Sequence, residues 1–142
     1  MQHWSSRKGW DRDRTLWCGY VLEEENSGRA IFAGDTGWFD GVQLIGEEYG
    51  PFDLALLPIG AYTPQEFMKP QHVNPAQAVE MMRALKAHNA LPIHWGTFQL
   101  TSEHYLEPRD WLLRILEEEK DPLIKKGFAS WNIGETIDVT PK

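Results

Sequence analysis

The chain has 142 residues, a formal net charge of −7 and a pI near 5.2. This acidic balance argues against nucleic-acid binding, because that function needs cationic surface to neutralise phosphates. The single cysteine, Cys18, cannot form an intrachain disulfide, and a zinc site built from paired cysteines is excluded. No run of 18 apolar residues occurs, and residues 1–4 lack the apolar core of a signal peptide. We therefore expect a soluble, cytoplasmic chain.

The first part of the chain predicts a hairpin, a helix and a buried strand. Residues 14–25 and 29–33 are strand-like apolar runs, and residues 26–28 between them are typical of a tight turn. A helix is predicted across residues 42–49, where apolar residues recur with helical spacing. Residues 54–59 form a short apolar run bounded by proline and glycine, which predicts a strand buried on both faces.

The clearest helix signal follows a predicted loop. Residues 60–73 have little periodicity and contain two prolines, so we expect a structured loop there. Asn74 is a good N-cap, Pro75 suits the first helical position, and Gln77 can complete a capping box. The residues of this helix predicted to face inward are Ala78, Val79, Met82 and Leu85.

The remaining elements continue the alternation of strands and helices. Residues 91–93 predict a strand that leads directly into His94, and a helix should start near Pro108. The tail, residues 127–139, suggests one or two short strands. This order predicts an α/β fold with a mixed sheet and flanking helices, formed by a single partial domain over residues 1–142.

Five histidines are candidates for chemistry: His3, His72, His88, His94 and His104. A lone histidine is more often structural than a ligand, but position favours His94. Both His94 and Asp35 follow a predicted strand, where loops of α/β proteins face a cavity. Taken alone, Gly34-Asp35-Thr36-Gly37 favours a tight turn in which the aspartate caps its own loop.

Asp35-Thr36-Gly37 also matches the aspartic-protease signature. That chemistry needs two such carboxylates, and the chain has one copy of the motif, so a homodimer would have to supply the second. The predicted helical content argues against this interpretation.

Longer runs are more specific than any single residue. They occur in the order Gln2-His3-Trp4, Phe32-Ala33-Gly34-Asp35-Thr36-Gly37, Gly50-Pro51-Phe52-Asp53-Leu54-Ala55, Pro58-Ile59-Gly60-Ala61-Tyr62, Phe67-Met68-Lys69, Gln71-His72-Val73, Ile93-His94-Trp95-Gly96-Thr97-Phe98 and Glu103-His104-Tyr105-Leu106-Glu107-Pro108. Together these runs resemble the N-acyl-phosphatidylethanolamine-hydrolysing phospholipase D family of the metallo-β-lactamase superfamily. The resemblance extends from Gln2 to about Asp138 and implies the C-terminal half of an αβ/βα sandwich.

The resemblance also implies a zinc-dependent phosphodiesterase with two metal ions in the full-length enzyme. His3, Asp35 and His94 correspond to metal ligands, and Asp35 to the carboxylate that bridges the metals and takes part in catalysis. Neutral imidazole and carboxylate are suitable zinc ligands. Two bound metals would lower the pKa of a shared water, so that hydroxide attacks phosphorus at neutral pH.

Three further residues are implied to contact substrate. His72 lies in the loop before the capped helix, where it would bind a phosphate or assist proton transfer. A loop histidine that merely caps the helix is an equally good interpretation. Tyr62 and Lys69 lie in matched runs and are predicted to face the substrate.

The sequence departs from the family in one respect. The His-x-His-x-Asp-His loop, which carries four ligands, is absent. We therefore expect a C-terminal half that requires the missing N-terminal half or a homodimer partner. The expected substrate is a phospholipid or another phosphate-containing small molecule, with peripheral membrane contact in the full-length form. A related hydrolase of another substrate, such as a phosphorylated lactone, and a non-catalytic module remain alternatives.

Overall fold

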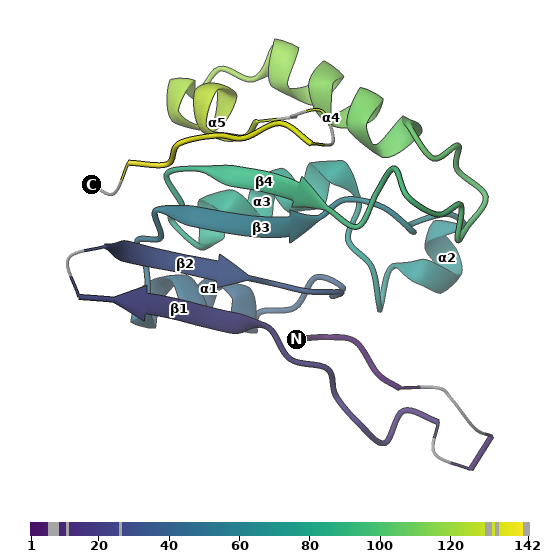
Figure 1. The fold of residues 1–142 in the computed structure, drawn as a ribbon. Helices are drawn as coiled ribbons and strands as arrows, with labels where there is room; N and C mark the ends of the chain where they lie inside the picture. The colour runs from purple at the N-terminus through teal and green to yellow at the C-terminus, as the bar shows by residue number, and fades with distance from the viewer. Residues whose placement is uncertain (6–8, 11, 26, 130–131, 133, 141–142) are drawn as a thin grey trace.

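The computed structural model describes residues 1–5, 9–10, 12–25, 27–129, 132 and 134–140. Its four strands are β1 (Tyr20–Glu24), β2 (Gly28–Phe32), β3 (Leu54–Pro58) and β4 (Ala90–Ile93). They form one sheet in the order β1-β2-β3-β4, in which β1 runs antiparallel to β2 and the other pairs are parallel (Figure 1). The predicted mixed sheet is confirmed. The carboxyl ends of β2, β3 and β4 therefore meet at one edge of the sheet.

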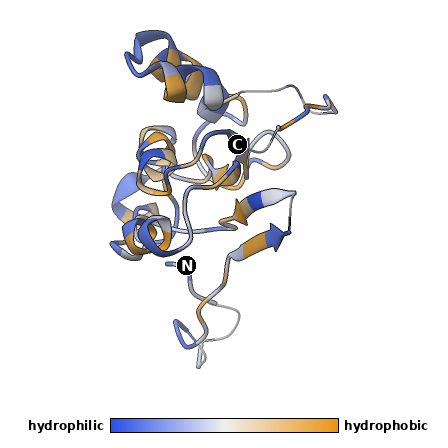
Figure 2. Cartoon of the chain, turned by 90° about the vertical axis from the view of Figure 1, so that its left-hand side faces the viewer, coloured by the Kyte–Doolittle hydropathy of each residue, from blue (hydrophilic) through white to orange (hydrophobic). Residues whose placement is uncertain are grey.

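Five helices accompany the sheet within the described residues: α1 (Gly41–Glu48), α2 (Gln65–Met68), α3 (Pro75–Ala84), α4 (Glu107–Glu118) and α5 (Pro122–Gly127). The larger helices gather on one side of the strands (Figure 2). Alternate strand residues such as Ile31, Ala55 and Leu57 point to that side and are fully buried in the core. This alternation follows from the two-residue repeat of a strand.

Helix α3 confirms the strongest local prediction. The Asn74 side chain accepts the Gln77 N–H at 2.9 Å, and the Gln77 side chain accepts the Asn74 N–H at 3.1 Å. This reciprocal pair satisfies two backbone donors that the first turn leaves free. The four predicted inward residues of α3 are all buried. Met81 is buried as well, because α3 packs against α1 and α4 in addition to β3.

Three predictions of local structure were wrong. The predicted loop 60–73 contains the short helix α2, and strand β1 starts at Tyr20 instead of near residue 14. Of the predicted strands of the tail, the described residues keep one isolated parallel bridge between Phe128 and Ala90, and residues 132 and 134–140 are irregular, while residues 130, 131 and 133 lie outside the described residues. Helix α5, which precedes the tail, was not predicted. Asp121 caps α5 by accepting the Leu123 N–H at 2.9 Å, so a local capping interaction decides this segment.

The sheet face away from the helices is largely uncovered (Figure 2). Strand β3, predicted to be buried on both faces, is only half-buried at Leu54 and Leu56. On the same face Leu22 and Phe32 are exposed, and the C-terminal segment reaches it at Ile137 and Val139. Across the described part of the chain, the helices are too short and too polar to span a bilayer.

Candidate metal and substrate site

The carboxyl edge of the sheet gathers an aspartate and three histidines from distant parts of the sequence. Asp35 follows β2 and His94 follows β4, and His94 Nε2 lies 3.4 Å from Asp35 Oδ1. The His72 ring stacks on His94 with centroids 5.1 Å apart, and His3 meets His72 edge-on at 5.0 Å. We call Asp35, His3, His72 and His94 the histidine cluster. The predicted proximity of Asp35 and His94 is confirmed.

The Trp17 ring packs against His3 on one side of the histidine cluster. Its ring lies 4.4 Å from that of His3, centroid to centroid, and its backbone N–H donates to the His3 carbonyl at 2.9 Å. The ring of His3 is therefore held between Trp17 and His72. Trp17 was predicted to lie in a strand, but it precedes β1, and its contact with His3 was not predicted because no short-range pattern links residue 17 to residue 3.

The turn after β2 brings the cluster together. Gly34 adopts a φ of +63°, which is easily reached without a side chain, and Thr36 is fully buried. Thr36 Oγ1 accepts the Gln2 N–H at 2.9 Å, and the Thr36 carbonyl accepts the Val73 N–H at 2.9 Å. Gln2 precedes His3 and Val73 follows His72. Thr36 thus fixes both neighbouring histidines beside Asp35.

Gly37 makes this assembly possible, because a Cβ there would lie 2.4 Å from the Pro70 carbonyl oxygen. We expect Gly37→Ala to push away the loop that carries His72 and to destabilise the fold by about 1–3 kcal/mol. Urea denaturation and the NMR resonances of the His72 ring measure the two effects. Gly9→Ala is the matched control, since nothing lies within 4 Å of a Cβ at Gly9. Equal stability and unchanged His72 resonances in both variants would contradict the prediction.

His94 is oriented by its own backbone and by the loop after β3. It has a φ of +60°, which is uncommon for a residue with a side chain. Its Nδ1 lies 3.4 Å from the Gly60 carbonyl oxygen, and a Cβ at Gly60 would lie 2.2 Å from the His94 carbonyl oxygen. This close approach leaves Nε2 directed toward Asp35.

Burial keeps two rings of the cluster uncharged. His3 and His72 are only 7% and 8% exposed. Burial lowers the pKa of His3, against the opposing effect of Asp35. Burial, followed by His94 and His3, lowers the pKa of His72 to about 4. The Nδ1 atoms of His3 and His72 are both buried and have no hydrogen-bond partner in the described structure. A neutral imidazole with an unused nitrogen is the form that binds a metal.

The donor types of the cluster suit zinc, but the donors present do not complete a site. Within the described residues, no three histidine, cysteine, aspartate or glutamate side chains converge closely enough to hold a metal ion. Catalytic zinc sites use about three protein ligands for each ion. The described residues therefore do not form a complete metal site by themselves, and the ligand roles of His3, Asp35 and His94 stay predictions.

The other candidates lie outside the cluster. Tyr62 is 3% exposed and its hydroxyl donates to Glu107 Oε1 at 2.8 Å, so this hydroxyl is already engaged. Lys69 is exposed at the end of α2. His104 is exposed, and its Nδ1 accepts the Leu106 N–H at 3.3 Å. His88 precedes β4 and thus lies at the opposite edge of the sheet.

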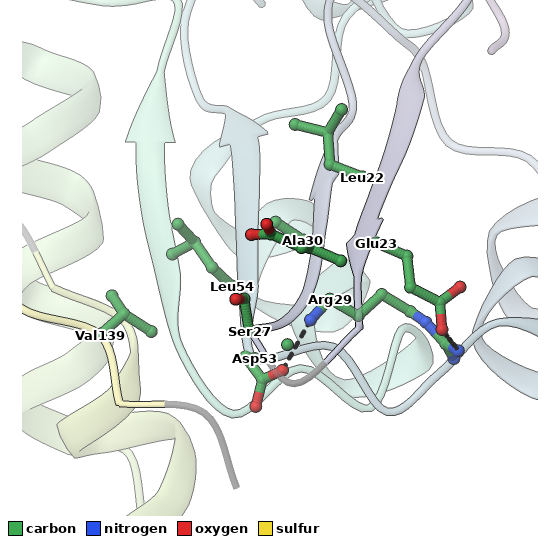
Figure 3. Close-up of a pocket in the computed structure, with 10 residues that line it drawn as sticks. Leu22, Glu23, Ser27, Arg29, Ala30, Asp53, Leu54 and Val139 are labelled. Atoms are coloured by element: carbon green, nitrogen blue, oxygen red, sulfur yellow. Dashed lines mark hydrogen bonds and ion pairs between the residues drawn. The ribbon is translucent and has the colours of Figure 1, made fainter.

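Two of the hollows in the described structure bear on where a substrate could bind. One of about 240 Å³ adjoins His94 and is lined by Trp95, Thr97, Phe98 and Leu100. The other, of about 320 Å³, lies beside the hairpin, where the Arg29 N–H donates to Asp53 Oδ2 at 2.8 Å (Figure 3). No member of the histidine cluster lines this second hollow. Of these two hollows, the one beside His94 is the one that adjoins the cluster.

The chain is similar to known proteins over most of its length. A model of the Beta-lactamase superfamily domain matches residues 1–95. The N-acyl-phosphatidylethanolamine-hydrolyzing phospholipase D 1 of Caenorhabditis elegans is 45% identical over 143 residues, which cover 99% of the chain and 40% of that protein. The mitochondrial enzyme of the same name from Saccharomyces cerevisiae is 40% identical over 117 residues, covering 81% of the chain and 25% of that protein. The chain thus spans less than half the length of either relative.

A solved structure supports the same grouping. A metallo hydrolase from the archaeon Ignicoccus hospitalis superposes with a TM-score of 0.53 and 26% identity, over 84% of the chain and 51% of that protein. The fold and these similarities are incompatible with the aspartic-protease interpretation of Asp35-Thr36-Gly37, which needs an unrelated architecture. The predicted α/β class and the predicted resemblance are confirmed, and the chain belongs to the metallo-β-lactamase superfamily.

Proposed function

We propose that the chain forms the C-terminal part of a metal-dependent phosphodiesterase that cleaves N-acyl-phosphatidylethanolamine into phosphatidic acid and an N-acylethanolamine. The observation that carries the proposal is the histidine cluster. It joins a carboxylate to one partly exposed histidine and to two buried, neutral histidines with unused nitrogens. The similarity to two proteins named for this hydrolysis supports the choice of substrate.

In this proposal His3, Asp35 and His94 hold zinc together with ligands from the rest of the full-length protein. Bound zinc would supply an activated water and stabilise negative charge on the phosphate. The Asp35 carboxylate would neutralise part of the metal charge, and its contact with His94 keeps both donors facing one point. Trp17 and His72 hold His3 in its orientation by ring contact on two sides.

His72 is proposed to bind the phosphate. Its ring lies against His94, and its buried Nδ1 has no hydrogen-bond partner among the described residues, so this nitrogen is not committed to another group. A neutral imidazole N–H can donate to a phosphate oxygen without repelling nearby cations. Lys69 and Tyr62 are placed less favourably, because Lys69 is exposed and the Tyr62 hydroxyl donates to Glu107.

An apolar wall beside the cluster fits a lipid. The hollow next to His94 is lined by Trp95, Phe98 and Leu100, and the last two are exposed. Apolar side chains around a polar centre are typical of a pocket that takes an amphipathic ligand. We propose that an acyl chain lies along this wall, and that the same side chains reach the membrane in the full-length protein.

Complementation tests the proposal. The chain alone should show little hydrolysis, because four ligands of the family are absent from its sequence. Joined to an N-terminal half that carries His-x-His-x-Asp-His, it should bind zinc and release N-acylethanolamine, and chelation should stop the reaction.

The possible outcomes separate the alternatives. A joined protein that binds no zinc would contradict the proposed function. If the joined protein bound zinc but hydrolysed only a phosphorylated lactone, N-acyl-phosphatidylethanolamine would be ruled out as its substrate. Robust turnover by the chain alone would show that a second copy completes the site.

A further inference from the structure

Two loops at the carboxyl edge of the sheet are joined by hydrogen bonds to the carboxylates of Glu103 and Glu107, which come well after β4 in the sequence. We call residues 59–64 the β3–α2 loop and residues 94–106 the β4–α4 loop. Glu103 Oε1 accepts the Tyr62 N–H at 3.2 Å, and Glu103 Oε2 accepts the Thr63 N–H at 3.1 Å. Just beyond the second loop, Glu107 accepts the Tyr62 hydroxyl at 2.8 Å. The β4–α4 loop therefore folds back and closes against the β3–α2 loop.

Glu103 is an unusual residue for a contact that serves only to stabilise the fold. It is 7% exposed, and within the described residues it forms no ion pair with lysine or arginine. Burial raises the pKa of Glu103, but hydrogen bonds from Thr101 and Thr63 outweigh this effect and leave the pKa below its usual value. A buried carboxylate is costly unless its oxygens are satisfied. Here each oxygen accepts one backbone N–H, which a neutral amide cannot reproduce because it has one acceptor oxygen.

The closed loops act directly on the histidine cluster. The β4–α4 loop begins at His94, and the β3–α2 loop contains Gly60, whose carbonyl oxygen lies 3.4 Å from His94 Nδ1. Any separation of the loops would move Gly60 relative to His94. Glu103 also lies near enough to affect His72: burial is the main cause of the low pKa of His72, and Glu103 is among the negative charges that oppose it.

We propose that Glu103 is a positioning residue, which locks the β4–α4 loop onto the β3–α2 loop and so holds His94 and the adjoining hollow in the arrangement that binds metal and substrate. The proposal rests on the proposed function, because it assigns Glu103 a role through His94. The buried Glu103 carboxylate accepts two backbone N–H groups of the β3–α2 loop, and the Gly60 carbonyl of the same loop contacts His94. These contacts connect Glu103 to His94 through one loop.

The test compares Glu103→Gln, Glu103→Asp and the control Glu117→Gln, which changes an exposed glutamate of α4. NMR records the His72 and His94 ring resonances, and hydrogen exchange records the amides of residues 95–101. In Glu103→Gln we expect shifted resonances of both rings and about tenfold faster exchange in this loop, with little change in the β3 and α3 amides. Glu103→Asp should restore part of both effects, since it keeps two carboxylate oxygens.

Glu103→Asp keeps the test decisive if Glu103→Gln fails to fold, because its shorter side chain draws the carboxylate away from the Tyr62 and Thr63 N–H groups, and smaller changes of the same kind are expected. Tyr62→Phe removes only the neighbouring bond to Glu107 and reports on the rest of the loop contact. In the joined protein Glu103→Gln should also weaken zinc binding about tenfold. Unchanged histidine resonances, or loop exchange that rises only in step with global unfolding, would overturn the proposal. Absence of zinc binding in the unaltered joined protein would contradict the proposed function, whereas the ring and exchange measurements would still decide the role of Glu103.

Discussion

Replacing Asp35 with asparagine should reduce phosphodiester hydrolysis by the joined protein about a thousandfold. The substitution keeps the shape of the side chain but removes the charge that faces His94 at 3.4 Å. A neutral amide is a weaker zinc ligand than a carboxylate, so zinc should bind more weakly as well. Hydrolysis rates and zinc titration of the same preparations measure both effects.

Asp40→Asn is the matched control for Asp35→Asn. Asp40 is an exposed residue at the start of α1 and forms no side-chain capping bond there. Its replacement makes the same chemical change outside the cluster, so activity should stay near that of the unaltered protein. If Asp35→Asn retained activity comparable to Asp40→Asn, the assignment of Asp35 as a metal ligand would have to be abandoned.

The second large effect concerns the uncovered face of the sheet. On its own, the 142-residue chain should self-associate through this face or unfold easily. Leu22, Ala30 and Leu54 lie side by side there (Figure 3), and exposed Phe32 extends the same surface. A broad apolar face costs free energy in water and is usually covered by a partner. A two-fold dimer is the expected ordered form, because one face can pack against its own copy.

Sedimentation velocity across a dilution series tests the self-association. Leu22→Lys should shift the chain toward monomer, because a buried lysine opposes packing of two such faces. Leu44→Lys is a close control: Leu44 lies on α1, among the helices, and both leucines are 62% exposed. A stable monomer at high concentration, with cooperative unfolding and no binding of a hydrophobic dye, would contradict the prediction.

Local chemistry allowed much of the framework to be predicted from sequence. Asn74, Pro75 and Gln77 define the start of α3 through contacts within one turn, and the structure contains all of them. Asp35 and His94 each follow a predicted strand, and their proximity was expected from these positions together with the family resemblance; the structure places them 3.4 Å apart.

The tertiary structure alone decided how the site is assembled. Thr36 joins Gln2 to Val73, Trp17 packs on His3, and Glu103 accepts hydrogen bonds from backbone N–H groups 41 and 40 residues away. None of these contacts repeats with a helical or strand period, so no pattern in the sequence indicates them. They form because parallel strands bring their following loops to one edge, where buried polar groups must find partners across the chain.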